Sequence, residues 1–262
     1  MSRYYLFLLV MLAARPVVAT DNYSYKDDEY AIISDGRSPD GRWSIAAHGR
    51  GEAGYEDFDL YLMREPAHEK LASLHTGECL DTSPLSIIAV WAPDSKHVAV
   101  LNRSDRHVLD LRLFTISGGR AQSIKVPLLL DVVGQQHLNP EVHYQVLSRL
   151  YRVAWPQPDQ LSLKELDSLR SSATIFREAL EPYLTFNDQD AEDRFTNFSA
   201  SATARIASND ELRLDGVKAL PLSDWPKTIV YSLHLRVDPH RGLHNTETTV
   251  SSLDAQKDGK YA

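Results

Sequence analysis

The chain is poor in cysteine and, after its first residues, in long apolar runs. Cys79 is the single cysteine among 262 residues, so no disulfide can form within one chain. A chain of this length can fold around a core without such cross-links. We expect Cys79 to act as a small buried hydrophobic residue, and the alternatives are an intermolecular bridge and a reactive thiol. The longest later apolar stretch, residues 126–133, contains Pro127 and Asp131. It is too short to cross hydrocarbon, so we predict no membrane span.

Familiar catalytic and nucleotide-binding motifs are also absent. The chain has no G-x-S-x-G nucleophile elbow and no Walker A loop. Residues 49–54 (GRGEAG) have the spacing of a dinucleotide-binding loop, but they lead into strand-like residues and not into a helix. The chain lacks a block rich in lysine and arginine. These absences predict no cofactor and no nucleic-acid partner, and they favour a protein that is not an enzyme.

The N-terminus has the features of a secretory signal. Arg3 precedes an apolar run over residues 4–14, and Ala19 ends a segment of modest side chains. We therefore expect residues 1–19 to be a signal peptide that is cleaved after Ala19, which predicts a periplasmic or extracellular protein. Its loss removes two arginines and changes the formal charge from −8 to −10, which disfavours contact with nucleic acid or anionic lipid. Residues 20–29 are polar, and we expect a mobile start there.

A short turn phrase occurs twice, at residues 38–43 (SPDGRW) and 91–96 (WAPDSK). Proline presets φ for the turn, and aspartate can accept a hydrogen bond from the backbone two residues later. Short alternating or β-branched segments surround both copies. The pattern predicts one mainly β domain over residues 30–237, with strands near 30–33, 43–47, 58–63, 86–91, 97–101, 109–116, 202–206, 211–214 and 228–237.

The phrase and the strand after it resemble a known repeat. Residues 38–46 (SPDGRWSIA) precede 59–63 (DLYLM), and residues 91–99 (WAPDSKHVA) precede 110–114 (DLRLF). Over about residues 30–120 this pattern resembles the Pro-Asp blade repeat of TolB-like β-propellers, which are relatives of WD40-like propellers. A degraded third copy is found at residues 154–159 (AWPQPD). The resemblance implies a propeller-like array of short antiparallel strands, complete or incomplete, and a β-sandwich is the alternative.

One segment has helical spacing. Apolar side chains recur on one face over about residues 163–181, and Pro182 follows the run. We therefore predict a single amphipathic helix there that packs its leucine face on the sheet. From residue 238 to residue 262 the chain is polar, which predicts a loose C-terminal tail.

Candidate site residues are few. His48, Asp57 and Asp59 could supply acid–base chemistry if distant loops brought them together, and Asp238, His240 and His244 could bind a metal. The leading hypothesis is an exported, non-enzymatic protein that binds a protein or small ligand through loops of a propeller-like sheet. One alternative is an exported hydrolase whose site is assembled from the loop carboxylates and histidine. The other is a structural envelope protein.

Overall fold

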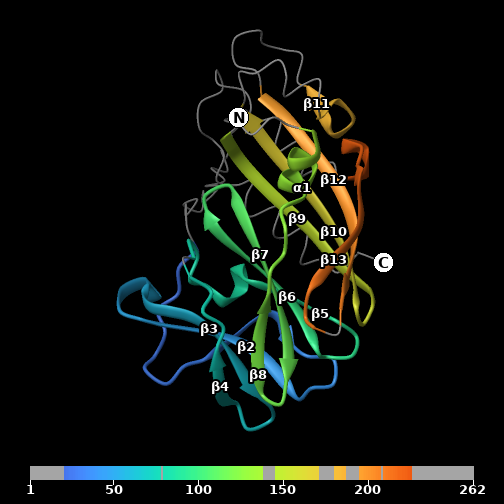
Figure 1. The fold of residues 1–262 in the computed structure, drawn as a ribbon. Coiled ribbons are helices and arrows are strands. Elements are labelled where there is room, and N and C mark those ends of the chain that lie inside the picture. Colours follow the sequence, from blue (N-terminus) through green and yellow to red (C-terminus); the bar gives the residue numbers. More distant parts are fainter. Residues whose placement is uncertain are drawn as a thin grey trace, which may run out of the picture.

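A computed structural model describes residues 21–77, 79–137, 145–170, 180–186, 195–207 and 209–225. The described strands fall into three groups in chain order (Figure 1). The first meander, an antiparallel run of neighbouring strands, consists of β1 (Ala31–Arg37), β2 (Trp43–Arg50), β3 (Glu56–Arg64) and β4 (Glu69–Ser73). The second meander repeats this plan with β5 (Ile88–Trp91), β6 (His97–Asp105), β7 (Val108–Ser117) and β8 (Arg120–Ile124).

The third group is built on longer strands, and it carries the one α-helix of the described residues. Its strands are β9 (Gln145–Gln157), β10 (Gln160–Arg170), β11 (Leu184–Phe186), β12 (Phe195–Ile206) and β13 (Leu212–Ala219). β10 lies between β9 and β12, and β11 and β13 pair with successive parts of β12. The helix α1 (Leu129–His137) connects the second meander to this group. Short 3-10 turns are η1 (Glu52–Gly54), η2 (Pro84–Ser86), η3 (Glu181–Tyr183) and η4 (Leu222–Asp224).

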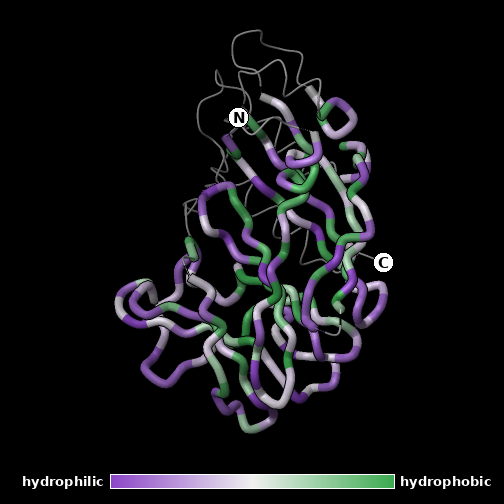
Figure 2. The backbone as a smooth tube through the Cα atoms, viewed as in Figure 1, coloured by the Kyte–Doolittle hydropathy of each residue, from purple (hydrophilic) through white to green (hydrophobic). Residues whose placement is uncertain are grey.

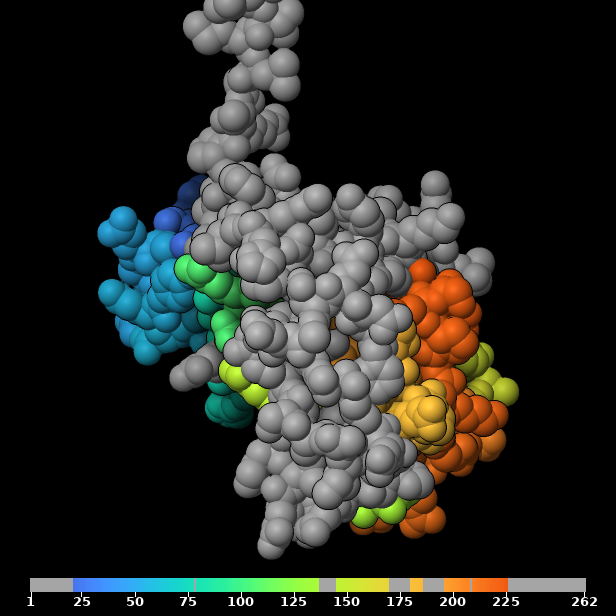
Figure 3. Space-filling view, turned by 90° about the horizontal axis from the view of Figure 1, so that it is seen from above, coloured from blue at the N-terminus to red at the C-terminus, as the bar shows by residue number. Residues whose placement is uncertain are grey.

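Two parallel contacts join the groups into one mixed sheet of 13 strands. Ser34 of β1 pairs with Ile88 of β5, and Val108 of β7 pairs with Arg149 of β9. The strand order runs β11-β12-β10-β9-β7-β6-β5-β1-β2-β3-β4, and its two ends do not meet. In Figure 3 the blue residues of the first meander and the orange residues of β12 and β13 lie on opposite sides of the molecule. The mainly β class is therefore confirmed, and the sheet is open.

The two turn phrases adopt the same backbone hydrogen bond. The Ser38 amide donates to the Trp43 carbonyl at 2.9 Å, and the Ala92 amide donates to the His97 carbonyl at 2.8 Å. Gly41 has a φ of 69°, which glycine adopts without the steric cost that a Cβ would add. The turn chemistry of the two copies therefore sets both β1–β2 and β5–β6 hairpins.

The aspartates of the two phrases also act alike. Asp40 Oδ1 accepts from the Arg42 amide at 3.0 Å, and Asp94 Oδ1 accepts from the Lys96 amide at 3.0 Å. The Asp40 amide donates to Ser95 Oγ of the other phrase at 3.1 Å. The two turns are thus linked to one another, at the same end of neighbouring meanders.

Hydrophobic residues concentrate along the inner strands, and hydrophilic residues follow many of the connections (Figure 2). One core joins the first and second meanders and includes Ile45, Leu60, Leu62, Ile87, Val98, Val100 and Phe114. A second core lies under α1 and includes Leu129, Leu130, Leu163, Leu166, Leu169, Phe198 and Trp225. Burial of this kind supplies most of the driving force for folding.

The predicted helix over residues 163–181 is wrong for residues 163–170, which belong to β10. Leu163 and Leu169 share one face of the strand, and Leu166 is buried on the other. Because both faces of β10 are covered, its apolar residues do not alternate strictly, and their spacing resembles that of a helix. Residues 171–179 lie outside the described residues.

The described residues at the start of the chain are hydrogen-bonded to a distant loop. The Asp21 amide donates to Asp81 Oδ1 at 2.8 Å, and the Tyr23 amide donates to Thr82 Oγ1 at 2.9 Å. These contacts hold the segment against the loop before η2. The signal peptide, the strand expected at 228–237 and the tail at 238–262 lie outside the described residues.

Candidate functional site

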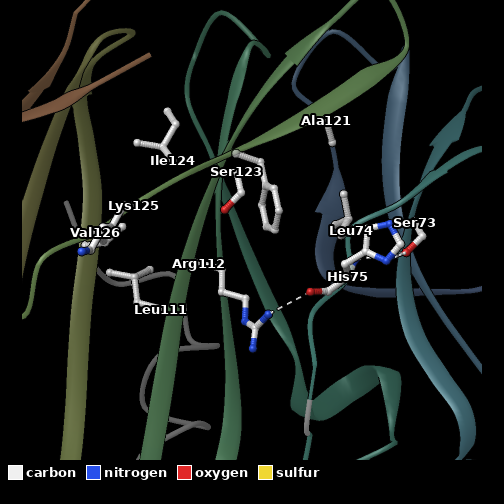
Figure 4. Close-up of a pocket in the computed structure, with 11 residues that line it drawn as sticks. Ser73, Leu74, His75, Leu111, Arg112, Ala121, Ser123, Ile124, Lys125 and Val126 are labelled. Atoms are coloured by element: carbon white, nitrogen blue, oxygen red, sulfur yellow. Dashed lines mark hydrogen bonds between the residues drawn. The ribbon is translucent and has the colours of Figure 1, made fainter. Parts of the chain in front are cut away.

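A groove lies between the first and second meanders, and its volume is about 400 Å³. We call it the inter-meander groove (Figure 4). The end of β4 and the loop after it form one side, and β7, β8 and the residues after β8 form the other. Its lining consists of Ser73, Leu74, His75, Leu111, Arg112, Phe114, Ala121, Ser123, Ile124, Lys125 and Val126.

The groove combines an apolar wall with two basic side chains. Leu74, Phe114 and Ile124 belong to the buried core, so the wall they present is continuous with the packed interior. Arg112 and Lys125 are the cationic members of the lining, and none of the described residues that line it is a carboxylate. On a chain of formal charge −8, this concentration of positive charge in a concave surface favours an anionic ligand.

Within the described residues, Arg112 is held by one hydrogen bond and one long ion pair. Its Nη1 donates to the His75 carbonyl at 3.2 Å, which Figure 4 shows as a dashed line. Its Nη2 lies 3.9 Å from Asp110 Oδ2, a long ion pair. A Cβ on Gly77 would lie 3.4 Å from Nη2, so the guanidinium passes close to this backbone. A guanidinium has five N–H donors, and among the described residues that of Arg112 donates one hydrogen bond, to the His75 carbonyl.

A second, more open pocket adjoins the groove and has a volume of about 440 Å³. Ser73 and His75 line both pockets, and the remaining lining residues here are Asp57, Phe58, Asp59, Tyr61 and Gly77. Two of the three predicted acid–base residues, Asp57 and Asp59, therefore border this surface.

Asp59 is bound into a network that shapes the loop after β4. Its Oδ1 accepts from the amides of Leu60 at 2.8 Å and Thr76 at 2.9 Å, and from Thr76 Oγ1 at 2.9 Å. Its Oδ2 accepts from Ser73 Oγ. Burial by itself would raise the pKa of Asp59, but the hydrogen bonds from Ser73, Thr76 and Leu60 outweigh it and lower the pKa. A carboxylate stabilised in this way is a weak base.

The other two predicted acid–base residues have different partners. His48 faces Asp59 across the β2–β3 register, but its Nδ1 lies 2.7 Å from the Glu29 carbonyl and its ring stacks on Tyr30. Asp57 has a φ of 50° and forms an exposed ion pair with Arg50. The polar atoms of the three residues thus take part in three separate sets of contacts.

Sequence reasoning missed Ser73 and His75. Ser73 Oγ lies between Asp59 Oδ2 and His75 Nδ1, which is 3.0 Å away. Because the hydroxyl has one proton and donates it to Asp59, the His75 ring donates to Ser73 Oγ. In a hydrolytic triad the histidine lies between acid and nucleophile, whereas here the serine occupies the middle position. No spacing in the sequence relates residues 73–75 to Arg112 and Lys125; only the packing of β4 near β7 and β8 does.

The remaining site hypotheses concern Cys79 and a metal. Cys79 is partly buried, Asn102 Nδ2 lies 3.2 Å from its Sγ, and burial raises the pKa of its thiol to about 11. Within the part of the chain that the structure describes, no three histidine, cysteine or carboxylate side chains converge as metal ligands would. Asp238, His240 and His244 lie outside that part.

A charged cluster is buried in the third strand group, away from the groove. The carboxylate of Glu165 accepts from the amides of Leu129 at 2.9 Å and Leu130 at 3.1 Å, so it caps α1 from β10. Asp167 accepts from Arg149 Nε at 2.9 Å and Nη2 at 3.0 Å. Both carboxylates have no exposed surface. Burial and then the negative charge of Asp167 raise the pKa of Glu165 to about 8.

Neither the scan of protein-family models nor the search of curated proteins finds a match to this chain. The resemblance to TolB-like and WD40-like propellers therefore stays a prediction. Among the helices of the described residues, none has the length and apolar character needed to cross a membrane.

Proposed function

We propose that this chain is an exported, non-enzymatic binding protein whose ligand occupies the inter-meander groove. The observation that carries the proposal is the groove itself, where an apolar wall meets Arg112, whose guanidinium donates one hydrogen bond among the described residues. Binding sites typically combine a largely apolar concave surface with a few placed polar groups. Export is part of the proposal and is supported by the signal-like features of residues 1–19.

We further propose that the meanders are propeller-like blades in an open array. Trp91 Nε1 donates to the Gly36 carbonyl at 3.1 Å, and Trp155 Nε1 donates to the Val90 carbonyl at 2.8 Å. Gly36 and Val90 are separated by the same 54 residues as the prolines of the two turn phrases. Each strand group thus contacts the preceding one in the same way, as repeats of a stacked array do.

The contacts favour binding over the two other hypotheses. A hydrolase would need a base beside its nucleophile, but the carboxylate next to Ser73 has a lowered pKa and accepts four hydrogen bonds. A structural envelope protein would be expected to expose a large apolar patch. The large exposed hydrophobic side chains of the described residues are three, Tyr23, Tyr55 and Leu85.

The test blocks the groove in the protein produced by its natural host. Native mass spectrometry of the chain isolated from the exported fraction would compare wild type, Ser123→Trp and Gln122→Trp. Ser123 lines the groove, whereas Gln122 is exposed next to it on the same strand and is not in the lining. We expect wild type and Gln122→Trp to retain a bound small molecule or protein that Ser123→Trp loses, with all three melting alike. A wild type without a bound species, or an equal load on Ser123→Trp, would overturn the proposal.

A further inference from the structure

We infer that the inter-meander groove binds a monoanionic carboxylate with a small apolar body. The ligand is either a short free organic acid or the C-terminal residue of a peptide, because both present the same groups. This inference rests on the proposed function, since it names the class of ligand for the same groove. It follows from the charge at the groove, from its walls and from its closed end.

The charge balance favours one negative charge on the ligand. Arg112 and Lys125 bring two cations to the groove, and Asp110 lies 3.9 Å from the guanidinium of Arg112. This carboxylate offsets part of the positive charge and leaves about one charge to be matched by a ligand. Lys125 is exposed and forms no ion pair with the described residues. A planar guanidinium with free donors binds a carboxylate through two parallel hydrogen bonds.

The walls favour an apolar body directly beside that carboxylate. Leu74, Leu111, Phe114, Ala121, Ile124 and Val126 supply the apolar part of the lining. A volume of about 400 Å³ lies near the lower end of the range for small-molecule sites, roughly 300 to 1,000 Å³. Transfer of a small alkyl or aromatic group from water to such a wall is favourable.

The shape of the groove limits the length of its occupant. Gly119, in the turn between β7 and β8, has a φ of 80°, and a Cβ there would lie 3.3 Å from Leu71 of β4. The turn and β4 therefore meet at this end, and an extended chain cannot run along β8 beyond it. A short acid or a chain terminus fits a groove that is closed at one end.

The test measures binding of simple probes to the full chain by calorimetry and by amide chemical shifts. The probes are isovalerate, isovaleramide, inorganic phosphate, and an acetylated Gly-Gly-Val tripeptide with either a free or an amidated C-terminus. We expect the free carboxylates to bind about tenfold or more tightly than the matched amides, as a charge-assisted hydrogen bond pair implies. The shifts should fall on residues of β7 and β8.

Variants of Arg112 distinguish a paired hydrogen bond to the ligand carboxylate from general attraction of an anion to a basic surface. Arg112→Gln should weaken carboxylate binding by about tenfold or more, and Arg112→Lys should weaken it less, because the charge stays but the fork is lost. Arg120→Gln removes an exposed charge from β8 outside the lining and should change affinity by less than about twofold. Melting curves would verify that each variant folds.

The outcomes distinguish a free acid from a peptide terminus, and they distinguish failure of the carboxylate inference from failure of the proposed function. Tighter binding of the free-acid tripeptide than of isovalerate identifies a peptide terminus, and the reverse identifies a free acid. Binding of phosphate alone, or equal binding of acids and amides, overturns the carboxylate inference. If no probe binds while Ser123→Trp still loses a species that the native protein carries, the inference fails and the proposed function stands.

Discussion

Replacing Glu165 with glutamine tests how the third strand group tolerates a buried carboxylate. The side chain has no exposed surface, and it accepts the Leu129 and Leu130 amides at the start of α1. Glutamine has the same shape but only one acceptor oxygen, so one buried amide would lose its partner. An unsatisfied buried donor costs about 1 to 3 kcal/mol. We expect Glu165→Gln to be less stable than wild type by that amount at pH 6, where wild-type Glu165 holds its proton, and we expect this difference to shrink as the pH rises.

The pH dependence has a definite sign. The pKa of Glu165 is raised in the folded state, to about 8, by burial and then by the charge of Asp167. A raised pKa means that the folded state holds its proton more tightly than the unfolded chain does. The resulting stabilisation is fully present below the unfolded pKa of about 4.3 and is lost as the pH rises through about 8, by up to about 1.4 kcal/mol per pH unit.

The assay is urea unfolding of the full chain, followed by tryptophan fluorescence at pH 6, 7, 8 and 9. Wild type should lose stability over this range, whereas Glu165→Gln should show a shallower loss because it has no proton to release. Glu69→Gln is the surface control, because Glu69 forms an exposed ion pair with Arg64 that is worth little. Parallel pH profiles for wild type and Glu165→Gln would refute the reasoning, because the pH dependence would then come from a group other than Glu165.

Three further predictions follow from single contacts. Trp155→Phe removes the indole donor from the Val90 carbonyl and should lower the free energy of unfolding by about 1 kcal/mol, measured by urea titration. An unchanged midpoint would mean that this hydrogen bond does not stabilise the contact between the strand groups. Asp59→Asn should increase hydrogen exchange at the Thr76 amide by about tenfold, because that amide donates to Asp59. An unchanged exchange rate would mean that the Asp59 carboxylate does not stabilise this loop. Cys79, whose pKa burial raises to about 11, should react with iodoacetamide at pH 8 at least about tenfold faster in urea than in the folded chain.

Local chemistry made much of the first two meanders predictable. Proline and aspartate at Pro39-Asp40 and Pro93-Asp94 set turns through their own backbone, and the alternating residues beside them form strands at or near the expected positions. The preference for a mainly β domain came from the same short-range rules. These features depend on residues that are near one another in the chain.

The tertiary structure decided the rest. Residues 163–170 are a strand because β9 and β12 pair with both edges of β10, and such pairing outweighs the helical spacing of the leucines. Arg112 meets His75 only because β7 lies near the end of β4. Glu165, expected in a helix, instead caps α1 from a strand more than 30 residues away in sequence. The groove and the buried carboxylates depend on how distant strands pack, which no local pattern encodes.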